Sequence, residues 1–169
     1  WQGKVWDKLG HDEPWMHEGS ADALAYEVMY RMGQYSQEKY DEVWQHAEQE
    51  CIYHLGKSSV YKGAETGNFK IVYHCGALIN HLVGGVIDGD DYSDGLWRFW
   101  RTMASWPEEE RHTPKSEDLF FKTLTKLGVH EVRQGAIINF LAVKHEDPVQ
   151  AVNMLKYRLG LAKSAYPSR

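Results

Sequence analysis

The stretch that decides the fold is residues 68–87, which read NFKIVYHCGALINHLVGGVI. Its apolar residues recur at helical spacing and leave almost no polar face: Tyr73, Ala77, Leu78, Leu82, Val83 and Ile87. A segment of this length and apolar density predicts a helix that is buried on most of its sides. Gly89, Asp90 and Asp91 follow and predict its end. The rest of the fold must therefore be built around this helix.

The segments on either side also show helical periodicity. Apolar or small residues spaced three and four apart predict helices over residues 18–32, 36–51, 93–103, 116–127, 129–145 and 148–160. We expect Ser36, Ser93 and Ser116 to cap three of these helices, and Asp147 before Pro148 is a strong helix start. Residues 56–67 and 106–114 are predicted loops, and residues 1–15 an irregular segment. The chain is thus predicted to be one all-α domain, residues 1–169, with about seven helices.

Composition limits the classes of function. The 169 residues are 43% hydrophobic and 13% aromatic, which is enough for a real core, and the net charge of -5 is spread along the chain. A nucleic-acid-binding protein would show a basic stripe, so we expect no nucleic-acid partner. No run of about 18 apolar residues occurs, so we expect no membrane span in this chain.

Trp15-Met16-His17-Glu18-Gly19-Ser20-Ala21-Asp22 is the first stretch that suggests chemistry. A Glu near a helix start, followed at once by Gly, presents an unobstructed carboxylate, and zinc accepts such an oxygen when the helix holds it rigidly. Taken alone, Glu18 is more simply an acidic residue that the helix dipole favours in a first turn.

Tyr73-His74-Cys75-Gly76 is the second such stretch. A phenol near the start of a buried helix can donate a hydrogen bond to an oxyanion that forms on a carbonyl. Taken alone, Tyr73 is more simply a core residue whose hydroxyl bonds a carbonyl.

Together the two stretches resemble the gluzincin zinc metallopeptidases, such as aminopeptidase-N-like and glycyl-aminopeptidase-like enzymes. In those families an HExxH helix supplies two His ligands and a general base, a W-x-x-E-G pattern supplies a Glu ligand, and a Y-x-x-G pattern supplies a Tyr that stabilises the tetrahedral intermediate. Trp15, Glu18 and Gly19 match the first pattern, and Tyr73 and Gly76 match the second.

This resemblance covers residues 1 to about 130 and implies the C-terminal helical half of a thermolysin-like catalytic domain, with further helices after it. It implies that Glu18 is a zinc ligand and Tyr73 a catalytic residue. His17, Asp22, His74 and Gly76 are then candidates for lining the site.

The chain also departs from the family. It contains no HExxH, since Ala21 stands where the second His after His17-Glu18 would be, and Cys75 replaces the usual Lys of the Tyr motif. We therefore expect a fragment that is inactive alone and holds no cofactor by itself. Zinc, the peptide substrate and an HExxH-bearing segment upstream would belong to the intact parent.

Other interpretations stay open. Cys51 and Cys75 are read first as two buried free thiols and second as one disulfide. His46 and Glu50 form an i,i+4 pair that is typical of a solvated helix surface. The alternatives to a peptidase fragment are a non-catalytic helical interaction domain, with Trp97, Phe99 and Trp100 as its partner surface, and a small all-α enzyme that uses His74 or His81.

Overall fold

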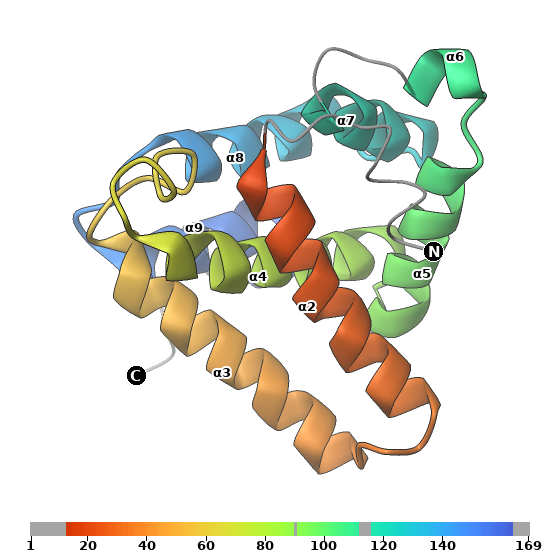
Figure 1. Ribbon diagram of the computed structural model, residues 1–169, viewed down its shortest axis with the longest axis horizontal. Coiled ribbons are helices and arrows are strands. Elements are labelled where there is room, and N and C mark those ends of the chain that lie inside the picture. Colours follow the sequence, from red (N-terminus) through yellow and green to blue (C-terminus); the bar gives the residue numbers. More distant parts are fainter. Residues whose placement is uncertain (1–12, 90, 112–115, 164–169) are drawn as a thin grey trace.

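The computed structural model describes residues 13–89, 91–111 and 116–163, and within them the chain is all-α, with eight helices and no strand (Figure 1). The helices are α2 (Pro14–Arg31), α3 (Gln37–Leu55), α4 (Phe69–Ile87), α5 (Tyr92–Ala104), α6 (Glu108–Arg111), α7 (Ser116–Lys126), α8 (Glu131–Ala142) and α9 (Pro148–Leu159). The predicted all-α class is confirmed. The seven predicted helices are present, and α6 is a short additional helix in the predicted loop 106–114.

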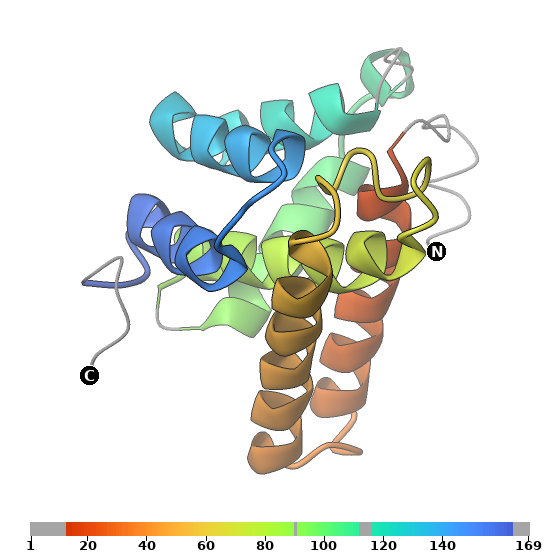
Figure 2. The ribbon, with the colours of Figure 1, turned by 90° about the vertical axis from the view of Figure 1, so that its left-hand side faces the viewer.

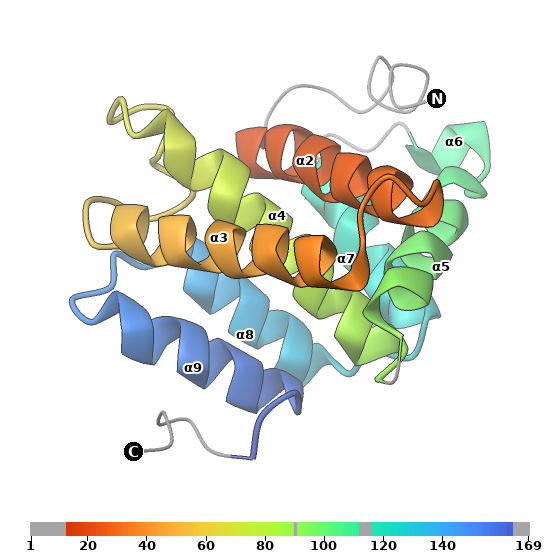
Figure 3. The same ribbon diagram turned by 90° about the horizontal axis from the view of Figure 1, so that it is seen from below.

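Helix α4 lies at the centre, as its apolar sequence predicts, and packs against α2, α3 and α5. Helices α2 and α3 diverge from the turn that joins them, and each packs against α4 (Figures 1 and 2). Helix α9 runs beside α3 on the side away from α2 (Figure 3). By length and composition alone α4 could cross a membrane, but 67% of its most apolar window is buried inside the fold, which is the position of a core helix.

Several helix boundaries follow their local signals. The Ser36 hydroxyl accepts a hydrogen bond from the Lys39 amide at the start of α3, and the Asp147 carboxylate accepts one from the Gln150 amide at the start of α9. Gly160 ends α9 in the left-handed conformation, with a φ of 79° that favours glycine.

Other boundaries differ from the prediction. The side chain of Asp91, not Ser93, caps α5, and α8 is shorter at both ends than the predicted range 129–145. Helix α2 begins at Pro14, so Glu18 is past its first turn. The helix dipole acts mainly on the first turn, and the simple explanation of Glu18 as a helix-start acid is therefore weakened.

The α5 aromatic residues do not form a surface. Phe99 and Trp100 are buried, and Phe99 packs against Phe120 of α7 with ring centroids 4.8 Å apart. The Trp100 indole donates a hydrogen bond to the buried Asn80 of α4 at 3.1 Å. The predicted partner surface of Trp97, Phe99 and Trp100 is therefore wrong, because α5 turns two of the three rings into the core.

Candidate functional site

Helices α2 and α4 cross in direct backbone contact at two glycines. A Cβ on Gly19 would lie 2.3 Å from the Gly76 Cα, and a Cβ on Gly76 would lie 2.2 Å from the Trp15 carbonyl oxygen. No side chain fits in either place. Gly19 and Gly76 come from the two sequence motifs, so this crossing brings the motifs together.

Trp15 anchors the same crossing from the other side. Its ring is buried and packs edge-on against Phe120 of α7, with centroids 5.2 Å apart. The Trp of the first motif thus fixes the start of α2 against the core, as its position before Glu18 suggests.

Glu18 and Tyr73 meet beside this crossing. The pKa of Tyr73 is raised chiefly by the interaction of its phenol with the nearby Glu18 carboxylate. Burial and the negative charges of Glu18 and Asp22 raise that pKa further. Glu18 is half-buried, and Tyr73 is 36% exposed. At neutral pH the phenol therefore keeps its proton and remains a donor.

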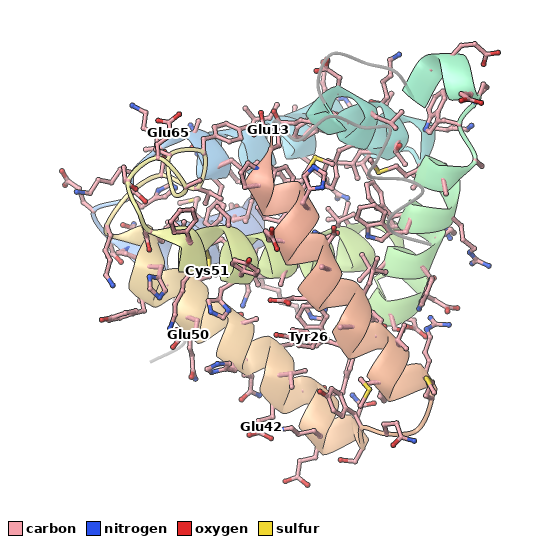
Figure 4. All side chains as sticks on the ribbon, viewed as in Figure 1. Glu13, Tyr26, Glu42, Glu50, Cys51 and Glu65 are labelled. Carbon is pink, nitrogen blue, oxygen red and sulfur yellow. A yellow bond between two sulfur atoms is a disulfide. The ribbon has the colours of Figure 1, made fainter. Side chains whose placement is uncertain are left out.

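Asp22 extends the acidic face one helical turn beyond Glu18. Burial raises the pKa of Asp22, and the nearby charge of Glu18 raises it further. Tyr26 follows after another turn of α2, and burial, then the charge of Asp22, raise the pKa of Tyr26 (Figure 4). Asp22 thus lies in the same electrostatic environment as Glu18 and Tyr73. His17, the other candidate on α2, is half-buried.

His74 belongs to a different group of side chains. Its Nε2 lies 3.9 Å from the Glu50 carboxylate of α3, and its ring stacks over His54 with centroids 6.3 Å apart. Burial lowers the pKa of His74, against the opposing effect of Glu50. The contacts of His74 are therefore with α3, and none is recorded with Glu18.

The α3 side of this group was missed by the sequence analysis. His54 Nε2 lies 3.7 Å from the same Glu50 oxygen, and the His46 ring is 6.1 Å from that of His74. The signal was present, because His46, Glu50 and His54 are four residues apart and share one helix face. The interpretation of His46 and Glu50 as a solvated pair overlooked the imidazole that α4 brings to them.

A disulfide joins Cys51 of α3 to Cys75 of α4, at the end of α3 labelled in Figure 4. The prediction favoured two free thiols and is wrong. Both cysteines face the contact between the two helices, where their Cα atoms are 4.7 Å apart, a separation within the range of disulfides. Cys75, which replaces the Lys of the family motif, is thus turned toward α3, while Tyr73 is turned toward α2.

The described residues do not by themselves complete a metal site. Among the residues that the structure describes, no three His, Cys, Asp or Glu side chains form a group that could hold a metal ion. Glu18 offers one half-buried carboxylate, which lies near the Tyr73 phenol. A catalytic zinc site takes three protein ligands, so Glu18 can be at most one part of such a site.

Comparison with known proteins gives no assignment: no family model, no curated protein and no solved structure matches this chain.

Proposed function

We propose that this chain supplies the glutamate ligand and the transition-state-stabilising tyrosine of a gluzincin-type zinc metallopeptidase, and that its all-α fold corresponds to the C-terminal helical half of a thermolysin-like catalytic domain. The observation that carries the proposal is the contact of Gly19 with Gly76, which brings the Tyr73 phenol near enough to Glu18 for that carboxylate to raise the pKa of Tyr73. Residues of two motifs far apart in the sequence therefore lie close to one another in the fold. A core tyrosine with no functional relation to Glu18 would not need to lie beside that carboxylate.

The residues fit a zinc site in part. Zinc binds carboxylate oxygen, and Glu18 is held on a helix whose position Trp15 and Gly19 fix. The other two ligands would be imidazoles of an HExxH helix in an upstream segment of the same protein. When bound, zinc would polarise the peptide carbonyl and activate a water molecule.

Tyr73 has a separate role in this proposal. Its protonated phenol would donate a hydrogen bond to the carbonyl oxygen of a peptide substrate as negative charge develops there. While no substrate is present, the interaction with Glu18 would keep the phenol beside this carboxylate, which is the proposed zinc ligand. Asp22 adds negative charge to the same region, and we propose that it lines the substrate side of the site.

The test uses the full parent protein and aminoacyl fluorogenic substrates. Tyr73→Phe should lower kcat by about 10²–10³-fold, which is typical of a lost oxyanion donor, and leave zinc content unchanged. Glu18→Gln should lower zinc content as well as activity. Tyr157→Phe is the matched control, because Tyr157 is 49% exposed on α9, and it should leave both unchanged.

Two results would overturn the proposal. One is a parent gene without a pair of imidazoles on the preceding helix. The other is Tyr73→Phe with full activity. The chain by itself should show no peptidase activity and only weak zinc binding, since one carboxylate cannot hold the ion against water.

A further inference from the structure

Two cavities adjoin His81 of α4, about two helical turns beyond Tyr73. One has a volume of about 320 Å³ and lies among α3, α4, α9 and the start of α5. The other has a volume of about 520 Å³ and lies among α2, α3, α4 and α5. Asp41, His81 and Tyr92 line both cavities, so the two spaces are neighbours. Each volume lies within the range of small-molecule sites.

Aromatic rings form the walls of these cavities. The Trp44 and His81 rings stack with centroids 4.1 Å apart, and Tyr92 lies on the His81 ring at 4.8 Å. Tyr30 and Tyr40 stack at 4.2 Å on the side of the larger cavity. Tyr40 and Trp44 are buried in the core, whereas Tyr30, His81 and Tyr92 are partly exposed where they line the cavities.

Polar atoms among these rings lack partners. Trp44 Nε1 and His81 Nδ1 are buried and have no hydrogen bond in the described part of the chain. Desolvation lowers the pKa of His81 to about 3, so the imidazole is neutral at physiological pH. Such orphaned atoms are rare in native proteins, and a bound molecule or water is the usual explanation.

The charges that line the cavities are mainly negative. Two of the acids are compensated: Glu48 pairs with Lys156 at 2.6 Å, and Asp94 pairs with Arg31 at 2.5 Å. Within the part of the chain that the structure describes, Asp41 accepts a single hydrogen bond, from the Gln37 amide at 2.8 Å.

Asp91 is the other uncompensated acid. Its side chain caps α5. Burial and then Glu27 are the main causes that raise the pKa of Tyr40, and the charge of Asp91 adds to them. In the described residues neither Asp41 nor Asp91 has a cationic partner. Two uncompensated carboxylates thus lie beside a wall of aromatic rings.

We propose that these adjoining cavities form a binding site for a small organic cation of the alkylammonium class. Aromatic faces attract such a cation through their quadrupoles, and carboxylates at the rim attract its charge. The cavities are too large for a bare metal ion, and an anion would be repelled by Asp41 and Asp91. This site is separate from Glu18 and Tyr73, and it does not depend on the proposed peptidase function.

The test titrates the whole chain with choline and, in parallel, with 3,3-dimethylbutan-1-ol, its uncharged isostere. The readout is the indole N–H resonance of Trp44, assigned with the variant Trp44→Phe. Choline should shift this resonance saturably, and the isostere should shift it much less.

Charge variants then locate the site. Asp41→Asn and Asp91→Asn should each weaken choline binding about three- to tenfold, since each removes one charge beside the aromatic wall. Asn also caps helices well, so Asp91→Asn should keep α5 intact. Asp118→Asn removes the same charge from the exposed face of α7 and should leave the affinity unchanged.

Three outcomes would overturn the proposal. They are the absence of a saturable shift, equal shifts by choline and by its isostere, and equal weakening by Asp118→Asn and by the two site variants. Thermal melts of the Asn variants exclude loss of folding as the cause of weaker binding.

Discussion

Breaking the disulfide should cost this protein a large share of its stability. Cys51 and Cys75 are separated by 24 residues along the chain. In the chain-entropy description, a crosslink that closes a loop of this length stabilises the folded state by about 3.4 kcal/mol at 25 °C, because it restricts the unfolded chain. For a protein of this size that corresponds to a decrease in Tm of about 7–14 °C.

The assay is urea denaturation of Cys51→Ala, Cys75→Ala and the double variant. Either single substitution breaks the bond, so each should lose the crosslink contribution in full. The double variant should then lose about 3.4 kcal/mol less than the sum of the two single variants. Additive losses would refute the reasoning, and so would a titration that finds two free thiols in the unfolded wild-type protein without reductant.

Two further predictions concern residues already described. Gly19→Ala and Gly76→Ala should each destabilise the protein by about 1–3 kcal/mol in thermal melts, because the new methyl group would force α2 and α4 apart. Gly135→Ala, on an open face of α8, is the control and should be neutral or stabilising. Equal losses of stability at all three positions would contradict the close contact between α2 and α4. Burial lowers the folded-state pKa of His81 to about 3, below its unfolded value of about 6.5. The unfolded state therefore binds the proton more readily, and stability is lost as pH falls from about 6.5 toward 3. Between pH 7 and pH 5 this residue should account for about 2 kcal/mol of lost stability in urea denaturation, and a His81→Gln variant with an unchanged loss would show that another group is responsible.

Local sequence signals were sufficient to predict most of the helices. The apolar run of α4 and the cap formed by Asp147 before Pro148 depend on neighbouring residues alone, and both predictions are confirmed. The start of α2 was misplaced because Pro14 was read as part of an irregular segment, although proline is favoured in a first helical turn. Asp91 and Ser93 are both good caps, and nothing in their spacing decides between them.

The proximity of Glu18 to Tyr73 could be expected from the sequence only through the two motifs. Periodicity indicates that Glu18 and Tyr73 lie on helices, but not that the helices touch. The resemblance supplied that expectation, and the glycine contact is its physical cause. The disulfide and the contact of His74 with Glu50 depend on how α3 crosses α4, which no local pattern encodes.

The close contacts of α4 also restrict how it can move. Besides the crossing with α2 and the covalent link to α3, α4 touches α5 where a Cβ on Gly95 would lie 2.0 Å from the Gly84 carbonyl oxygen. A slide of α4 along its axis by one turn would replace the glycines with larger residues at both crossings, and the covalent link opposes the same displacement. Helix α4 therefore has one permitted register and cannot slide along its axis. Any closure around a ligand must come from the helices packed around it.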